Sequence, residues 1–147
     1  MARSIVATVQ RKGGVGKTTI AVCLSGEFYA RGKRVTLVDA DPQQSSLHWA
    51  APRQLPFAVR DIPFEEERPA RWIKTIIAPS PDDFTIVDTA TTEEALRAAV
   101  LSSRLILLPC TPSGIDIEAT IEALYFINCI RVKNRLHVDA QIGRAHV

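Results

Sequence analysis

A short segment near the start of the chain, QRKGGVGKTT at residues 10–19, carries the residue types that bind phosphate. Its glycines allow the backbone to curl so that several N–H groups point inward at an anion. A helix predicted to begin at Lys17 adds the positive end of its dipole. The Lys17 ammonium can reach the β- and γ-phosphates of a nucleotide, and the Thr18 hydroxyl is placed to bind Mg²⁺. The residues expected to hold the nucleotide are Gly13, Gly14, Val15, Gly16, Lys17, Thr18 and Thr19.

The alternative for this segment is a glycine-rich turn with an unrelated lysine. The order of its glycines, lysine and threonines, between a predicted strand and a predicted helix, disfavours that alternative. One position departs from the common phosphate-loop pattern G-x-x-x-x-G-K-[ST], because Arg11 stands where the pattern has glycine. The three glycines that remain keep the flexibility that a phosphate-binding loop requires.

Three aspartates follow predicted strands and offer oxygen ligands. Asp39 and Asp41 stand two residues apart at a strand end, so that one can address a metal ion and the other a water molecule. Pro42 stiffens the turn behind them. Asp88 ends an apolar strand and would hold Mg²⁺ as a hard oxygen ligand. Asp-Pro turns and strand-end aspartates are frequent, but together with the phosphate loop these residues predict a magnesium–nucleotide site.

Alternating strand and helix patterns position these residues. Strands are predicted at 4–9, 34–38, 84–87 and 105–109, with a weaker edge strand within 55–62 that two prolines interrupt. Helices are predicted at 18–30, 70–78, 93–101 and 116–131. Ile20, Leu24 and Phe28 are expected to share one face of the first helix. The side chains expected to face the core are Trp72, Ile73, Ile76 and Ile77 in the second helix, and Ile117, Thr120, Ile121, Leu124 and Ile127 in the last. Thr92 is a predicted N-cap.

Continuously apolar strands that alternate with helices predict a mostly parallel sheet covered on both faces, a three-layer α/β/α fold. In such sheets ligands bind at the carboxyl ends of the strands. The phosphate loop and the three aspartates all follow strand ends, so the organisation and the chemistry agree. A chain of 147 residues is long enough for one domain, which is predicted to cover residues 1–140.

The segment KGGVGKTT at residues 12–19 resembles the deviant Walker A motif of the ParA/MinD family of P-loop ATPases, which are of the SIMIBI type. The resemblance implies that Lys12 reaches across a nucleotide-sandwiched dimer to the ATP of the partner. A positive charge arriving in trans would stabilise the charge that develops during phosphoryl transfer. The segment DADPQ at residues 39–43 resembles the first switch of the family, in which Asp41 would orient the attacking water and Asp39 would support the magnesium shell.

The strand FTIVD at residues 84–88 has the Walker B layout of the same family, and PCTPS at 109–113 resembles its strand-end proline turn. The family often continues the Walker B aspartate with Thr or Gly and then two prolines, whereas this chain has DTATT at 88–92, so its second switch is expected to flex differently. The resemblance assigns catalysis to Lys12, Lys17 and Asp41, and metal binding to Thr18, Asp39 and Asp88.

The resemblance extends over roughly residues 1–135 and implies a Mg²⁺- and ATP-dependent ATPase similar to the small ParA-type proteins that partition plasmids or chromosomes. In that function ATP closes a homodimer that binds DNA non-specifically, and a ParB-like centromere-binding protein stimulates slow hydrolysis. The expected location is the cytoplasm, at the nucleoid when ATP is bound.

Three alternatives stay open. The first is a MinD-like positioning protein or a conjugation factor, with the same switch and a different cargo. An electron-transfer or metal-carrier relative would need paired cysteines, and the chain has no C-x-x-C. A non-hydrolysing P-loop scaffold is disfavoured because Lys12, Lys17, Asp41 and Asp88 are all present.

Composition adds few constraints. A net charge of +2 argues neither for nor against a nucleic-acid partner. The apolar runs are only a few residues long, far short of the roughly 20 that a membrane span needs, so a membrane is not indicated. Cys23, Cys110 and Cys129 lie far apart in apolar surroundings and are predicted to be buried free thiols.

The C-terminal residues 141–147 are expected to be non-native. One back-translation of Ile142–Val147 matches a common sequencing-library adapter. The natural chain is therefore expected to continue past about Ala140 into further strands and helices. A natural stop directly after Val147 is the alternative.

Overall fold

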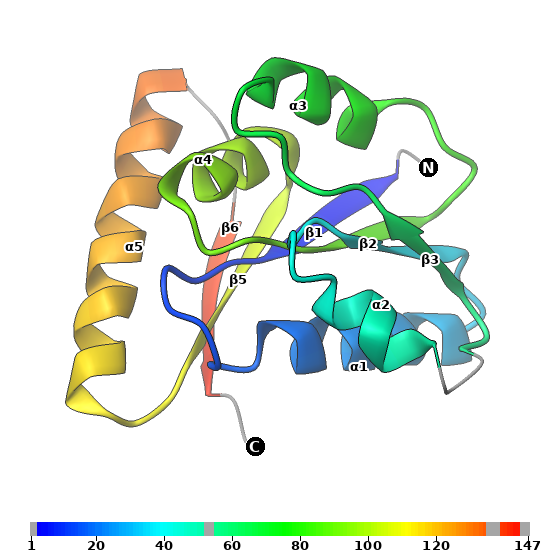
Figure 1. Cartoon of the computed structure of the whole chain (residues 1–147), viewed down its shortest axis with the longest axis horizontal. Helices are drawn as coiled ribbons and strands as arrows, with labels where there is room; N and C mark the ends of the chain where they lie inside the picture. Colours follow the sequence, from blue (N-terminus) through cyan, green and yellow to red (C-terminus); the bar gives the residue numbers. More distant parts are fainter. Residues whose placement is uncertain (1–2, 52–54, 135–138, 145–147) are drawn as a thin grey trace.

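A computed structural model of the chain describes residues 3–51, 55–134 and 139–144, which form a single sheet covered by helices (Figure 1). The elements in chain order are β1 (Ser4–Thr8), α1 (Lys17–Ala30), β2 (Val35–Asp39), α2 (Ser45–Ala50), β3 (Ala58–Asp61), α3 (Pro69–Ile77), β4 (Phe84–Asp88), α4 (Glu93–Ser102), β5 (Leu105–Cys110), α5 (Gly114–Asn134) and β6 (Asp139–Arg144). The six strands have the order β3-β2-β4-β1-β5-β6, and every neighbouring pair is parallel. The predicted three-layer parallel fold is confirmed.

The helices form two layers on opposite faces of the sheet. Figure 1 shows α1 and α2 on one face and α3, α4 and α5 on the other. Each face of the sheet packs against its helices in a separate hydrophobic core, and successive residues of β1 belong to the two cores alternately. Ile5 and Ala7 pack with the α3–α5 layer, and Val6 packs with the α1 layer, because side chains alternate across a strand. On the α1 side, Phe28 stacks on Phe84 with 4.0 Å between ring centroids. Both faces of the sheet are therefore buried, as its apolar strands predicted.

Local sequence signals set several element ends. The predicted cap is confirmed, because the Thr92 hydroxyl accepts a hydrogen bond from the Ala95 N–H at 3.3 Å at the start of α4. Gly32 follows α1 with a φ of 74°, a left-handed conformation that glycine adopts without strain. β3 is an edge strand, as the prolines near it predicted.

The strand register brings the polar strand ends together. Thr8 of β1 and Asp39 of β2 both lie opposite Asp88 of β4, which is the strand between them. The phosphate loop leaves the sheet directly after β1, and α1 begins at Lys17. The residues that the sequence singled out therefore meet at the carboxyl ends of the central strands.

Some predictions about burial are wrong. In α5, Ile117 and Ile121 are 47% and 60% exposed, and in α3 Ile77 is 51% exposed. The buried residues of α5 are Asp116, Thr120, Ala123, Ile127 and Ile130. In α1, where Ile20, Leu24 and Phe28 were expected to share a face, all three are half-buried, and Leu24 and Phe28 pack against the core. The fully buried positions of α1 are Lys17, Ala21, Val22 and Ser25.

The burial prediction for the cysteines is also wrong. Cys23 on α1 and Cys129 on α5 are exposed, and Cys110 is half-buried. All three are free thiols. Their apolar sequence neighbours misled the prediction, because neighbours in a helix point in different directions.

Candidate functional site

The phosphate loop connects β1 to α1 and has the backbone that anion binding requires. Gly14 and Gly16 adopt φ values of 74° and 97°, a left-handed conformation that a side chain would strain. Gly16 caps α1, and its carbonyl accepts the Ile20 N–H at 3.0 Å. The first turn of α1 contains no acidic residue, so the positive end of the helix dipole is not neutralised there.

Lys17 stands at the first position of α1 with only 7% of its surface exposed. Burial lowers the pKa of its ammonium, and the nearby negative charges of Asp88 and Asp41 oppose that shift. A buried cation at the base of a glycine loop is the arrangement that receives phosphate charge.

Asp88 interacts with the charge of Lys17 and receives hydrogen bonds on one of its two carboxylate oxygens. Its Oδ2 accepts hydrogen bonds from the Thr18 hydroxyl at 2.7 Å and from the Ser46 hydroxyl at 2.6 Å. Its Oδ1 is buried and has no hydrogen-bond partner among the described residues. Burial raises the pKa of Asp88, and the bonds from Ser46 and Thr18 and the Lys17 charge oppose the rise. The group thus has a buried oxygen that lacks a partner.

Asp39 organises the loop that follows β2. Its Oδ1 accepts the Asp41 N–H at 3.1 Å and its Oδ2 accepts the Leu47 N–H at 2.9 Å. Burial raises the pKa of Asp39, and the bond from Leu47 opposes the rise. Asp41 is half-buried, and its Oδ1 accepts the Gln43 N–H at 2.9 Å. The structure therefore connects Asp39 to backbone groups and leaves Asp41 facing the pocket.

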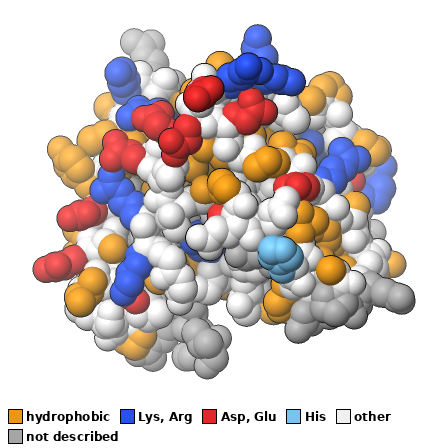
Figure 2. Space-filling view, viewed as in Figure 1, with side chains coloured by type: hydrophobic (Ala, Val, Ile, Leu, Met, Phe, Trp, Pro, Cys, Tyr) orange, Lys and Arg blue, Asp and Glu red, His pale blue; other side chains and the backbone are white. Residues whose placement is uncertain are grey.

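A pocket of about 610 Å³ lies over these groups, within the usual range for small-molecule sites. Figure 2 shows this face hollowed near its centre, where backbone and uncharged polar side chains make the surface white. The residues that line the pocket are Gly13, Gly14, Gly16, Lys17, Thr18, Thr19, Asp41, Pro42, Gln43, Phe64, Glu66, Ala90, Thr91 and Thr92. Most of the predicted nucleotide residues are among them.

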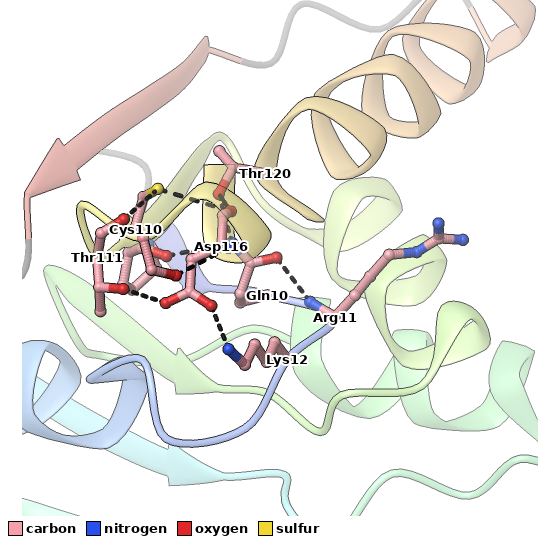
Figure 3. A network of polar contacts seen from close by, with 9 residues as sticks. Gln10, Arg11, Lys12, Cys110, Thr111, Asp116 and Thr120 are labelled. Carbon is pink, nitrogen blue, oxygen red and sulfur yellow. Dashed lines mark hydrogen bonds and ion pairs between the residues drawn. The ribbon is translucent and has the colours of Figure 1, made fainter. Parts of the chain in front are cut away.

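Other predicted residues lie outside the pocket lining. Val15 is 1% exposed and belongs to the interior, and Asp88 and Asp39 are buried behind the lining. Lys12 is also absent from the lining, and its ammonium pairs with Asp116 at the start of α5 (Figure 3).

Arg11, which stands where the common loop pattern has glycine, makes contacts with side chains of α4 and α5. Its guanidinium bonds Glu93 of α4 at 2.5 Å, lies 3.6 Å from the Glu122 carboxylate of α5, and stands over the Phe126 ring at 5.3 Å. Figure 3 shows the side chains of Arg11 and Lys12 extending from the loop in opposite directions. Gln44 is the one non-glycine residue with positive φ in the described ranges, so position 11 does not require glycine.

The sequence analysis missed several residues of the site. Ser46 was not singled out, although a hydroxyl seven residues after Asp39 was a usable signal once the loop was assigned to the site. Glu66 was not foreseen in the pocket wall, and Phe64, next to it in space, is 6% exposed. Asp116 was expected only as the start of a helix. Its contact with Lys12 joins residues 104 positions apart, which no local pattern reveals.

The fold and the site together define a P-loop nucleotide-binding protein. Residues 6–140 match the family described as the CobQ/CobB/MinD/ParA nucleotide binding domain. The chain belongs to this family.

Curated relatives include partition and positioning proteins. The chain is 35% identical over 123 residues to "Maintenance of carboxysome distribution protein A" of Gloeobacter kilaueensis, a match that covers 82% of this chain and 55% of that protein. It is 30% identical over 145 residues to "Protein ParA" of Rhizobium radiobacter, covering 97% of this chain and 63% of that protein. The chain thus spans about 60% of the length of these relatives.

Solved structures support the fold. An apo McdA structure from Cyanothece superposes with a TM-score of 0.79 at 17% identity, covering 95% of this chain and 71% of that one. The MinD cell division protein of Aquifex aeolicus superposes with a TM-score of 0.73 at 18% identity, covering 98% and 70%. Among the described residues, no helix combines the length and the hydropathy that a membrane span requires.

Proposed function

We propose that this chain is the nucleotide-binding part of a Mg²⁺-dependent ATPase that acts as an ATP-gated dimer. In this function the loop 13–19 and Lys17 bind the phosphates, Thr18 and Asp88 hold Mg²⁺ with support from Asp39, and Asp41 orients the attacking water. Lys12 acts on the ATP of the partner subunit. Mg²⁺ held by Thr18 and Asp88 would offset the negative charge that develops during phosphoryl transfer.

One observation carries this proposal: the buried Oδ1 of Asp88 has no partner among the described residues, while Oδ2 of the same carboxylate bonds Thr18 at the pocket floor. A buried carboxylate oxygen without a donor is costly, and a hydrated cation would satisfy it. Carboxylate and hydroxyl oxygens are the ligands that Mg²⁺ prefers. The residues present therefore fit a magnesium ion.

We further propose that the protein partitions or positions a cargo on DNA, with non-specific DNA and a ParB-like protein as partners. The names of the relatives support this class, since they include ParA proteins and carboxysome distribution proteins. The carboxysome-type relatives favour organelle positioning as a second candidate with the same switch. The proposed location is the cytoplasm, at the nucleoid in the ATP state.

The experiment uses the complete protein expressed from its native reading frame. Its mass in solution and its retention of non-specific duplex DNA are measured with Mg²⁺ and either ATPγS, ADP or no nucleotide. We expect dimers and DNA retention with ATPγS only, because only the triphosphate presents a γ-phosphate to the trans lysine. Equal masses in all three conditions would refute the ATP-gated dimer. Dimers that form with ATPγS but retain no DNA would refute the DNA partner alone.

Ser46→Ala is expected to raise the Mg²⁺ concentration needed for half-maximal stabilisation by ADP about tenfold. The Ser46 hydroxyl orients Asp88, and groups that orient a metal ligand typically contribute that much to metal affinity. The measurement is the melting temperature across a Mg²⁺ titration at fixed ADP. Ser102→Ala is the matched control, since this buried hydroxyl bonds only carbonyls within α4. Identical Mg²⁺ curves for the two variants would remove Ser46 from the metal site.

A further inference from the structure

We infer that Asp116 is a positioning residue for Lys12: its carboxylate holds the Lys12 ammonium within the same subunit, and this ion pair must open before Lys12 can act on a partner's nucleotide. The inference rests on the proposed trans role of Lys12. It adds a residue outside the motifs of the sequence, one that sets how readily the dimer forms.

The contact joins an exposed ammonium to a buried carboxylate. Lys12 Nζ bonds Asp116 Oδ1, and the side chains are 45% and 5% exposed, respectively. The lysine therefore approaches from the exposed side and can leave, whereas the carboxylate stays in the interior. An exposed ammonium that pairs with a buried carboxylate loses less side-chain freedom than two exposed partners would.

Both carboxylate oxygens and both backbone polar groups of Asp116 have hydrogen-bond partners (Figure 3). Its Oδ2 accepts a hydrogen bond from the Thr111 hydroxyl, and its N–H donates to the Ser113 hydroxyl at 3.2 Å. Its carbonyl accepts the Thr120 hydroxyl at 2.7 Å. Its place in the first turn of α5 also suits a negative charge, because the helix dipole is positive there.

A second set of bonds connects this network to the phosphate loop. Gln10 Nε2 donates to the Thr120 hydroxyl at 2.9 Å and to the Pro109 carbonyl at 3.1 Å. Gln10 is 1% exposed and stands two residues before Lys12. The start of the loop and the start of α5 are thus held together, so the distance between Lys12 and Asp116 is set by buried contacts.

While Lys12 is paired with Asp116, Lys17 is the cationic side chain among the described residues that line the pocket. Lys12 itself lies outside the lining. In addition, hydrogen bonds from Lys12 and Thr111 lower the pKa of Asp116, so the carboxylate is charged at neutral pH and competes with phosphate for the ammonium. Moving Lys12 to a partner subunit leaves Asp116 charged and buried with less compensation.

Removal of that charge is therefore expected to favour the dimer. Asp116→Asn in the complete protein should lower the protein concentration for half-maximal dimerisation with Mg²⁺ and ATPγS by about tenfold, an order of magnitude typical of a lost ionic contact. Asn keeps the size of the side chain and an oxygen that accepts from Thr111. Analytical ultracentrifugation measures the dimer, and fluorescence titration of labelled ADP checks that the monomer pocket is intact.

Two further variants complete the test. Ser113→Ala removes a neighbouring hydrogen bond without changing a charge and should dimerise like the parent. Lys12→Ala should dimerise poorly, and Asp116→Asn should have no additional effect in that background, because no ammonium remains to be held. If Asp116→Asn does not fold, Asp116→Ser replaces it, since serine is favoured at helix starts.

The outcomes separate the two ideas. A parent-like Asp116→Asn together with a weakened Lys12→Ala overturns the role of Asp116 and leaves the proposed function standing. The role of Asp116 is also overturned if Asp116→Asn lowers the dimerisation concentration equally with and without Lys12. The residue would then act independently of the lysine. If Lys12→Ala dimerises like the parent, the trans role fails, and the inference fails with it.

Discussion

Lys17→Ala is expected to weaken ATP binding by about 100- to 4,000-fold. The Lys17 ammonium is 7% exposed beside the phosphate loop, with Asp88 and Asp41 as its nearest charges. Loss of one member of a buried charge interaction costs roughly 3–5 kcal/mol, and each 1.4 kcal/mol corresponds to a factor of ten in affinity. Fluorescence titration with labelled ATP in the presence of Mg²⁺ measures the change.

The matched control for this prediction is Lys33→Ala. Lys33 is an exposed lysine just beyond the other end of α1, and its loss should leave the titration curve unchanged. Both variants are compared by thermal unfolding, so that a loss of binding is not confused with a loss of folded protein. A Lys17→Ala protein that is folded and binds ATP like the parent would show that the pocket does not hold nucleotide in the proposed way.

Asp41→Ala is expected to bind ATP, hydrolyse it about 100- to 10,000-fold more slowly, and accumulate as a dimer. Asp41 lines the pocket, its Oδ1 is oriented by the Gln43 N–H at 2.9 Å, and it stands outside the phosphate loop. The expected factor is that of a group that accepts or orients a proton in the transition state. Phosphate release gives the rate, and sedimentation with ATP gives the dimer fraction.

Asp82→Ala serves as the control, because Asp82 lies in the turn before β4, at the amino ends of the strands, and accepts a local bond from Ser80 at 2.7 Å. It should hydrolyse ATP like the parent. Parent-like hydrolysis by Asp41→Ala would show that the water is oriented by another group.

The sheet and the phosphate loop were predictable because their signals are local. β1, β2, β4 and β5 are short apolar runs whose ends fall within one residue of the predicted ones. The loop follows from glycines that must adopt positive φ, and Gly14 and Gly16 do so. Local chemistry and global fold agree in these segments, so sequence patterns were sufficient.

The packing face of α5 was not predictable in the same way. This helix carries apolar residues on more than one side. The predicted residues Thr120, Leu124 and Ile127 are buried or pack against the core, but Ile117 and Ile121 are exposed. The face that packs contains Asp116 and Thr120, which make polar contacts with Lys12 and Gln10. Apolar periodicity does not predict such contacts, because they join residues about 100 positions apart in the chain.

The roles expected of the aspartates were only partly accessible from the sequence. Spacing placed Asp39 and Asp41 in one turn, but not the fact that both Asp39 oxygens accept backbone N–H groups. The assignment of Asp39 to the metal shell stays a prediction, as does the non-native origin of 141–147. Residues 139–144 form β6 beside β5, and residues 145–147 lie outside the described residues.

The two exposed thiols make the molecule suitable for distance measurements by fluorescence. Cys23 and Cys129 lie on α1 and α5, which cover opposite faces of the sheet (Figure 1). Neither residue lines the pocket or takes part in the contacts of Lys12. Dyes attached to these natural cysteines would bracket the sheet without engineered attachment points. Energy transfer between a subunit labelled with a donor dye and a subunit labelled with an acceptor dye would then report subunit approach in real time.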